Sequence, residues 1–139
     1  MPLSFARHPW FVVNKKGAVS RFEVSATTDM GGQESPSGHL CVNALPLWEG
    51  LPVLRSLGYG RWTWSSRLVG IVEGDESSLA ARMIEAIEHS PKTYLNCYRY
   101  AYTGPNSNTY AQWVLNQFPE ASLKLPWNSF GKRFVEKLS

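Results

Sequence analysis

Residues 104–110 read Gly-Pro-Asn-Ser-Asn-Thr-Tyr and mark the start of a helix. Gly104 and Pro105 end the segment before it, because proline has no amide donor and fixes its own φ. The Asn and Ser side chains that follow are of the kind that cap a helix N-terminus. Apolar side chains then recur at helical spacing, at Tyr110, Trp113, Val114 and Phe118. The stretch predicts a helix over residues 106–118 with the hydroxyl of Ser107 in its first turn.

This hydroxyl has two interpretations. The amides at a helix N-terminus are unpaired and electropositive, which suits a nucleophile or a developing oxyanion. Ser107 is then a candidate reactive group. The alternative is that Asn106, Ser107 and Asn108 only cap a buried helix, which is the more frequent use of such residues. The residues alone leave both interpretations open.

The rest of the chain predicts an α+β fold with a mainly antiparallel sheet. Strand-like runs at 9–14 and 18–24 flank Lys15-Lys16-Gly17, a pattern typical of a hairpin. Further strands are predicted at 38–43, 62–73 and 93–103. An apolar stripe indicates one more helix, which residues 74–77 open and His89-Ser90-Pro91 ends, with its members at Leu79, Met83, Ala86 and Ile87. Strands outnumber helices and alternate with them only late in the chain, as in α+β proteins.

Composition indicates a single domain spanning residues 1–139, with 43% hydrophobic and 18% charged residues and a net charge of +3. The basic residues are scattered, which argues against a nucleic-acid partner. Cys41 and Cys97 lie in apolar settings and form no metal or disulfide framework, so we expect two buried thiols. No run approaches the roughly 20 apolar residues of a membrane span. The N-terminus lacks a signal-peptide pattern, so we expect cytoplasmic synthesis, and export would need a route without a cleaved leader.

Three histidines are candidate bases, and the position of His8 favours chemistry most. His89 falls at the end of a predicted helix, where a cation complements the helix dipole. His39 follows the glycine-containing loop 27–37, a candidate lid, and is expected at the surface. His8 enters the first strand directly ahead of Pro9-Trp10, where a sheet would hold its imidazole.

The predicted hairpin offers His8 an acidic partner. A hairpin centred on Lys15-Lys16 places Glu23 roughly opposite His8. Glu23 would then orient the imidazole, as a carboxylate does in a Ser-His-Asp triad. A register that differs by one residue would point the two side chains to opposite faces, so spacing alone does not decide their contact.

Several of these segments together resemble an uncharacterised bacterial family. Its members carry an H-x-W strand, an R-Y/F-E-V strand, a G-P-N-S-N-T-F/Y motif and an L-x-L-P…G-K-x-F ending. The matching segments here are His8-Pro9-Trp10-Phe11-Val12-Val13, Arg21-Phe22-Glu23-Val24, Gly104 to Tyr110, and Leu123-Lys124-Leu125-Pro126 with Gly131-Lys132. The resemblance covers roughly residues 7–134.

Residues 106–110 are also distantly similar to the Asn-Cys-x-x-Phe pattern of permuted papain-like proteins, the NlpC-type and lecithin–retinol acyltransferase group, with serine in place of cysteine. In that group a histidine on an early strand meets a cysteine at the start of a later helix. The resemblance implies a permuted papain-like fold with Ser107 at the nucleophile position, His8 as base and Glu23 as orienter. It also implies an oxyanion site at Asn106 and Asn108, formed by the Asn108 side chain or by the amides near Ser107.

Two functions follow from this resemblance. In the first, Ser107 and His8 serve a hydrolase or acyltransferase that acts on an amide or ester of a cell-wall peptide or a lipid. In the second, serine marks a non-catalytic module that binds a peptide, glycan or protein, because a site built for a thiolate does not simply work with a hydroxyl. In both, Trp10, Trp62 and Trp64 line the groove, and neither needs a cofactor or metal. The residues neither require nor exclude an immunity or regulatory partner.

Overall fold

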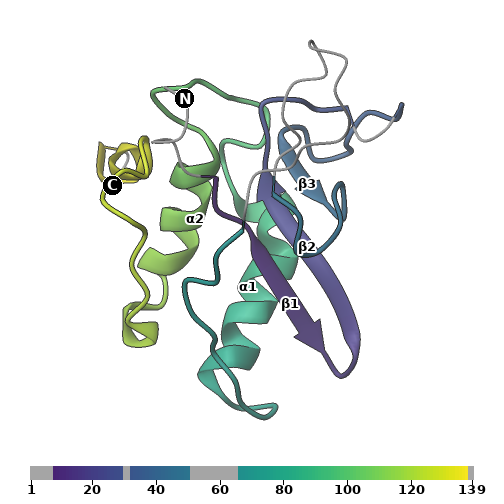
Figure 1. Ribbon diagram of the computed structural model, residues 1–139, viewed down its shortest axis with the longest axis vertical. Helices are drawn as coiled ribbons and strands as arrows, with labels where there is room; N and C mark the ends of the chain where they lie inside the picture. The colour runs from purple at the N-terminus through teal and green to yellow at the C-terminus, as the bar shows by residue number, and fades with distance from the viewer. Residues whose placement is uncertain (1–7, 30–31, 51–65, 138–139) are drawn as a thin grey trace.

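The structure is a computed structural model that describes residues 8–29, 32–50 and 66–137 of the chain. These residues form a small antiparallel sheet with helices packed against it (Figure 1). The α+β class expected from the sequence is confirmed at this level. The elements in chain order are β1 (Phe11–Lys15), β2 (Ala18–Val24), β3 (Leu40–Val42), α1 (Leu79–Thr93), α2 (Ser107–Asn116) and the 3-10 helices η3 (Pro119–Ala121) and η4 (Lys132–Lys137).

The predicted hairpin is present as β1 and β2, joined by a two-residue turn. Lys15 pairs with Ala18, and both turn residues, Lys16 and Gly17, have positive φ, at 52° and 90°. Such turns match the natural twist of a two-stranded ribbon. The Gly17 amide donates to Asn14 Oδ1 at 2.9 Å. β3 adds to the other edge of β2, so β2 is the central strand in the order β1-β2-β3.

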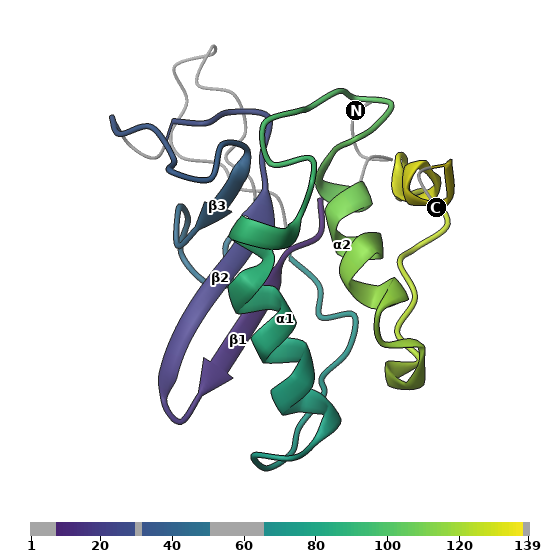
Figure 2. The ribbon, with the colours of Figure 1, turned by 180° about the vertical axis from the view of Figure 1, so that it is seen from behind.

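The two faces of β2 have different surroundings. Because side chains alternate along a strand, Phe22 and Val24 point to one face and Arg21 and Glu23 to the other. The first face packs against α1 and α2 and forms the main hydrophobic core, which also contains Val13, Leu40, Ile87, Tyr94, Cys97, Tyr110 and Val114. Figures 1 and 2 show α1 behind the sheet and α2 beside the β1 edge. Arg21 and Glu23 are therefore buried on the face away from α1.

The helices meet through hydroxyl and aromatic groups. Ser90 Oγ on α1 lies 2.8 Å from the Tyr110 hydroxyl on α2, within a buried pair. The Tyr110 ring makes edge contacts with Tyr94 at 5.2 Å and with Phe11 of β1 at 5.9 Å. Tyr110 thus joins both helices to the first strand.

Two predicted strands are wrong where the structure describes them. Residues 94–103, expected within a strand over 93–103, form turns and irregular backbone, and α1 runs through Pro91 to Thr93 instead of ending at Pro91. Residues 66–73, expected at the end of a strand over 62–73, are irregular; residues 62–65 lie outside the described residues. Aromatic and β-branched content favours strands only where a neighbouring strand is available to pair.

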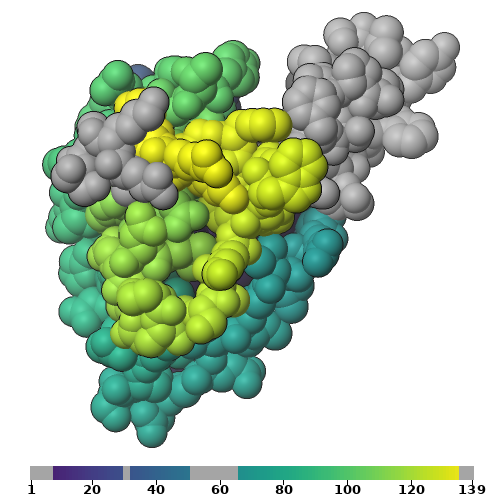
Figure 3. Space-filling model, turned by 90° about the vertical axis from the view of Figure 1, so that its left-hand side faces the viewer, coloured from purple at the N-terminus to yellow at the C-terminus, as the bar shows by residue number. Residues whose placement is uncertain are grey.

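After η3 the chain turns back along α2. Figure 3 shows the later residues, in yellow, running beside this helix on the surface of the molecule. Lys132 Nζ donates to the carbonyls of Pro126, at 3.0 Å, and Leu125, at 3.4 Å, which closes a compact loop before η4. In the described part of the chain, no helix is both long and apolar enough to cross a membrane.

Candidate functional site

The structure brings His8 and Glu23 into contact. His8 Nε2 lies 2.7 Å from Glu23 Oε2, and the two side chains are 16% and 1% exposed. Register explains the pairing. Phe11 pairs with Phe22, so the same register places Trp10 across from Glu23, and His8 is its diagonal neighbour on the same face. The carboxylate and the imidazole are therefore held by adjacent strands.

Arg21 holds the other side of the Glu23 carboxylate. Its Nη2 donates to Glu23 Oε2 at 2.9 Å, and its Nε lies 2.9 Å from Oε1 as an ion-pair contact outside hydrogen-bond geometry. Arg21 is fully buried. A planar guanidinium that faces both carboxylate oxygens fixes the plane of the carboxylate, which a flexible ammonium would not do.

The same arginine anchors the loop after β3. Its Nη1 donates to the carbonyls of Pro46, at 2.7 Å, and Glu49, at 2.5 Å. Trp10 covers the guanidinium, with Arg21 Cζ 4.1 Å from the ring centroid, and Trp10 Nε1 donates to the Leu47 carbonyl at 2.9 Å. Trp10, predicted to line a groove, lies against this buried arginine. A cation stacked on an aromatic ring and bonded to carbonyls compensates much of its own desolvation.

These neighbours keep Glu23 ionised. Burial alone would raise the pKa of Glu23, but hydrogen bonds from His8 and Arg21, with the charges of both, hold the pKa below its ordinary value of 4.5. A carboxylate only accepts hydrogen bonds, so His8 carries a proton on Nε2 where it faces Glu23. Nδ1 is then the ring nitrogen that can accept a proton from another group.

The start of α2 forms a second cluster. Asn106 is the N-cap: its Oδ1 accepts from the amides of Asn108, at 3.0 Å, and Thr109, at 3.2 Å. In return the Asn106 amide donates to Thr109 Oγ1 at 3.0 Å, which completes a capping box. The prediction that this motif caps a helix is confirmed.

The motif also binds the chain segment that follows η3. Asn106 Nδ2 donates to the carbonyls of Tyr102, at 3.0 Å, and Phe130, at 3.1 Å. Asn108 Nδ2 donates to the Phe130 carbonyl at 2.8 Å, and Thr109 Oγ1 donates to the Gly131 carbonyl at 2.8 Å. The Asn108 side-chain amide and the backbone amides of Asn108 and Thr109, which include the groups considered above for an oxyanion site, thus donate hydrogen bonds inside the protein.

Ser107 differs from its three neighbours. It is 6% exposed, and its hydroxyl forms no hydrogen bond with any residue that the structure describes, His8 included. The first residues of β1 and the start of α2 lie at the same end of the molecule (Figures 1 and 2). The structure thus joins His8 to Glu23 and places Ser107 at the same end without a bond to them.

The remaining candidates fall elsewhere. Trp62 and Trp64 lie outside the described residues. His39 Nδ1 contacts the Ser25 carbonyl at 2.9 Å, and His89 Nδ1 contacts the Glu85 carbonyl at 2.8 Å on α1. Burial raises the pKa of both the Cys41 and Cys97 thiols, which makes them poor nucleophiles. Both cysteines are free and buried, as expected from their settings.

A shallow hollow of about 270 Å³ opens between α1 and α2, away from His8 and Glu23. Its lining includes Arg82, Glu85, His89 and Trp113. It shares no residue with the cluster at the sheet. Among the described residues, no group of three or more His, Cys, Asp or Glu side chains could hold a metal ion.

Sequence reasoning missed Arg21. Its signal was available, because Arg21 and Glu23 are two apart in a strand and must point to the same face. A basic and an acidic side chain on one strand face are usually solvent-exposed, so the pattern was not distinctive. Only the carbonyls of the loop 46–49 and the Trp10 ring turn this pair into a buried one.

Comparison with known proteins identifies a family for this chain but no individual curated protein or solved structure similar to it. A search of curated proteins and a search of solved structures give no match. Residues 2–134 match the model of a family described as "Protein of unknown function (DUF3750)". This match spans both the His8–Glu23 pair and the start of α2. The chain therefore belongs to the DUF3750 family.

Proposed function

We propose that the protein is a hydrolase or acyltransferase that acts on an amide or ester, with Ser107 as nucleophile, His8 as base and Glu23 as its orienter. The observation that carries this proposal is the 2.7 Å contact between His8 Nε2 and the buried Glu23 carboxylate. A buried carboxylate that fixes one nitrogen of an imidazole leaves the other nitrogen oriented for proton transfer.

The chemistry follows from these roles. His8 Nδ1 takes the proton of the Ser107 hydroxyl as Oγ bonds to the substrate carbonyl carbon, and Glu23 stabilises the imidazolium. The carbonyl oxygen becomes an oxyanion at the positive end of the α2 dipole. The intermediate collapses to an acyl-serine, and His8 returns its proton to the leaving amine or alcohol. Water then releases the acid in a hydrolase, and an acceptor amine or alcohol takes the acyl group in a transferase.

A comparison within the motif supports the role of Ser107. Asn106 and Thr109 form the capping box, and Asn108 binds the Phe130 carbonyl. The Ser107 hydroxyl makes no such bond to a described residue, so helix capping does not require a serine at this position. A hydroxyl in the first turn of a helix is well placed for activation by the dipole.

The order of these parts along the chain supports a permuted papain-like arrangement. The histidine lies just before the first strand, and the candidate nucleophile begins a later helix, an order similar to that of the group that residues 106–110 resemble. The small sheet with a helix beside its β1 edge is compatible with this arrangement (Figure 1).

A fluorophosphonate probe tests the proposal without a known substrate, because it phosphonylates activated serines. We expect labelling of the wild-type protein, with the adduct located on Ser107 by peptide mass spectrometry. Ser107→Ala and His8→Ala should abolish labelling and keep a native circular-dichroism spectrum. The matched controls, Ser77→Ala in the exposed turn before α1 and His89→Ala on α1, should label at the wild-type rate. Labelling that survives in folded His8→Ala would rule out the mechanism.

A binding module without chemistry is the second candidate, and one observation favours it. No hydrogen bond joins Ser107 to His8 in the described part of the chain. A folded wild-type protein that no fluorophosphonate labels would support this candidate. The cluster of Arg21, Glu23 and His8 would then serve to fix the loop 46–49 against the sheet.

A further inference from the structure

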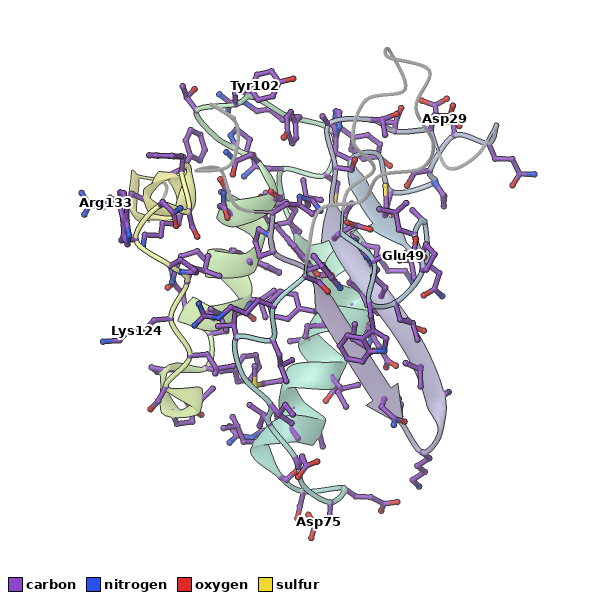
Figure 4. All side chains as sticks on the ribbon, in the orientation of Figure 1. Asp29, Glu49, Asp75, Tyr102, Lys124 and Arg133 are labelled. Carbon is purple, nitrogen blue, oxygen red and sulfur yellow. The ribbon has the colours of Figure 1, made fainter. Side chains whose placement is uncertain are left out.

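Exposed aromatic side chains occur in the two segments that are hydrogen-bonded to the start of α2. Tyr102 is 84% exposed, Trp127 is 85% exposed and Phe130 is 51% exposed. Large apolar side chains at such exposure are ordinary when single, but several together mark a contact surface. Figure 4 shows Tyr102 at the top of the molecule, near the end where α2 begins.

Hydrogen bonds place the backbones of Tyr102 and Phe130 around one side chain, and Trp127 lies three residues before Phe130. The single group Asn106 Nδ2 donates to the carbonyls of both Tyr102 and Phe130, so the two residues flank it from separate segments. Arg99, three residues before Tyr102, lies over the Phe134 ring with its Cζ 5.6 Å from the centroid. The loop 98–103 and the segment 127–134 therefore form one surface, which we call the aromatic rim.

The two segments of the aromatic rim contain basic residues and no acidic ones. Loop 98–103 and segment 127–134 contain Arg99, Lys132 and Arg133 and no Asp or Glu, and Lys124 lies three residues before the second segment. Lys132 is bonded to backbone carbonyls, whereas Lys124 and Arg133 are exposed on the side of the molecule seen at the left of Figure 4. Aromatic side chains with cations beside them suit a ligand that has an apolar layer beneath an anionic one.

We propose that the aromatic rim is a docking surface for an anionic lipid bilayer. Trp and Tyr favour the headgroup region, because a large apolar ring can be buried there while its polar atom stays hydrated. Lys and Arg beside them attract anionic headgroups, and each contributes about 1 kcal/mol near such a surface. Phe130 has no polar atom and gains most from an apolar medium. The contact is peripheral.

The position of the aromatic rim favours one class of substrate for the proposed reaction. Asn106, which holds Tyr102 and Phe130 in place, directly precedes Ser107 in the chain. A bilayer on the aromatic rim would therefore lie at the end of α2 that carries the proposed nucleophile. Resting on the proposed function, the inference selects a lipid ester or amide over a cell-wall peptide as the substrate class. The docking itself needs neither Ser107 nor His8.

Vesicle co-sedimentation tests the docking. The full chain is mixed with vesicles of phosphatidylcholine containing phosphatidylglycerol, and with vesicles of phosphatidylcholine alone. We expect binding to the first, weakened by salt, and much less to the second. Trp127→Ala should lower the partition coefficient about tenfold. Lys124→Gln with Arg133→Gln should lower it about 25-fold, about fivefold for each charge. Trp48→Ala is the matched control, because Trp48 is 62% exposed outside the aromatic rim.

Several outcomes would overturn the docking. The docking proposal would be wrong if the protein did not bind anionic vesicles at low salt. It would also be wrong if Trp48→Ala and Trp127→Ala lowered vesicle binding equally. Binding to single-stranded DNA but not to vesicles, with the same dependence on Trp127, would assign the surface to nucleic acid instead. Ser107→Ala separates the two proposals, because it should bind vesicles like the wild-type protein. Vesicle binding without any fluorophosphonate labelling would leave the docking standing and remove the proposed chemistry.

Discussion

Gly131 passes so close to Asn106 that a Cβ built on it would lie 2.5 Å from Asn106 Oδ1. Its φ is +92°, a conformation that L side chains rarely adopt. The absence of a side chain lets the Gly131 carbonyl accept from Thr109 while the backbone lies against the helix cap. Gly131 is thus part of the start of α2, although it is far from it in the sequence.

Gly131→Ala should lower the free energy of unfolding by about 2–4 kcal/mol, because it adds a steric clash with the cap to the cost of positive φ. Gly17 is the matched control. Its φ is +90°, and nothing lies within 4 Å of a Cβ built there, so Gly17→Ala should cost only about 1 kcal/mol. Urea denaturation of both variants measures the difference. Equal losses would show that Gly131 and Asn106 do not contact each other closely.

Asn106→Ala should destabilise the protein by about 2–4 kcal/mol. It removes a helix cap, worth about 1 kcal/mol, and leaves the carbonyls of Tyr102 and Phe130 without this donor. Ser107→Ala, the neighbouring control, should change the free energy of unfolding by less than about 0.5 kcal/mol, because alanine is a good helix former and no described residue bonds the hydroxyl. Thermal denaturation compares the two. A large loss in Ser107→Ala would mean that the serine is structural.

Arg21 and Glu23 should show strong energetic coupling. Arg21→Met or Glu23→Met alone leaves a buried charge without its main partner and should cost about 3–5 kcal/mol. The double variant removes both charges and should be destabilised by less than the sum of the single effects. A double-mutant cycle by urea denaturation gives the coupling energy. Additive effects would indicate that the two side chains do not interact.

The stability of the protein should fall in acid because of Glu23. Its pKa in the folded protein lies below 4.5, so the unfolded chain binds a proton first as the pH falls. Its stabilising contribution is complete above about pH 4.5 and is lost as the pH drops through the lower, folded pKa. Free energies of unfolding measured between pH 3 and 7 should show this loss, and Glu23→Gln should reduce it. Glu88→Gln, in an exposed ion pair with Lys15, is the control and should leave the loss in place.

Glu23→Gln also tests the proposed mechanism at a step that Ser107→Ala does not reach. An amide in place of the carboxylate favours the wrong imidazole tautomer and no longer stabilises an imidazolium. Loss of the acid in a serine triad lowers the rate by about 10⁴-fold. Under the proposed function we expect fluorophosphonate labelling to slow by about 10³–10⁴-fold in protein that remains folded by circular dichroism. Unchanged labelling in this variant would exclude Glu23 from the mechanism.

Local patterns predicted the elements that depend on local interactions. The strand Ala18–Val24 and the cap at Asn106 were both visible in the sequence, because alternation and capping chemistry act over a few residues. The prediction of a strand from Thr93 to Tyr102 was wrong, because aromatic residues are typical of strands but do not form one without a partner strand. Tyr94 is buried beneath α2, whereas Tyr98 and Tyr102 are exposed, so packing and not pairing determines this segment.

The sequence predicts the His8–Glu23 contact of the candidate site but not the burial of Arg21. The His8–Glu23 contact follows from a hairpin register, which a short turn restricts to few possibilities. The burial of Arg21 depends on the carbonyls of Pro46 and Glu49, and the aromatic rim depends on a segment that returns across α2. Contacts between distant segments leave no periodic signal in the chain.

The hydrogen bonds between the start of α2 and a later segment also set the order of events during synthesis. Asn106 is added to the growing chain 24 residues before Phe130, whose carbonyl accepts a hydrogen bond from its side chain. At about 5–20 residues per second, that interval lasts about 1–5 s. During this interval the hairpin and α1 can form, but the first turn of α2 lacks its hydrogen bonds to the carbonyls of Phe130 and Gly131. Any activity at Ser107 would therefore be withheld from the nascent chain until this segment has been translated.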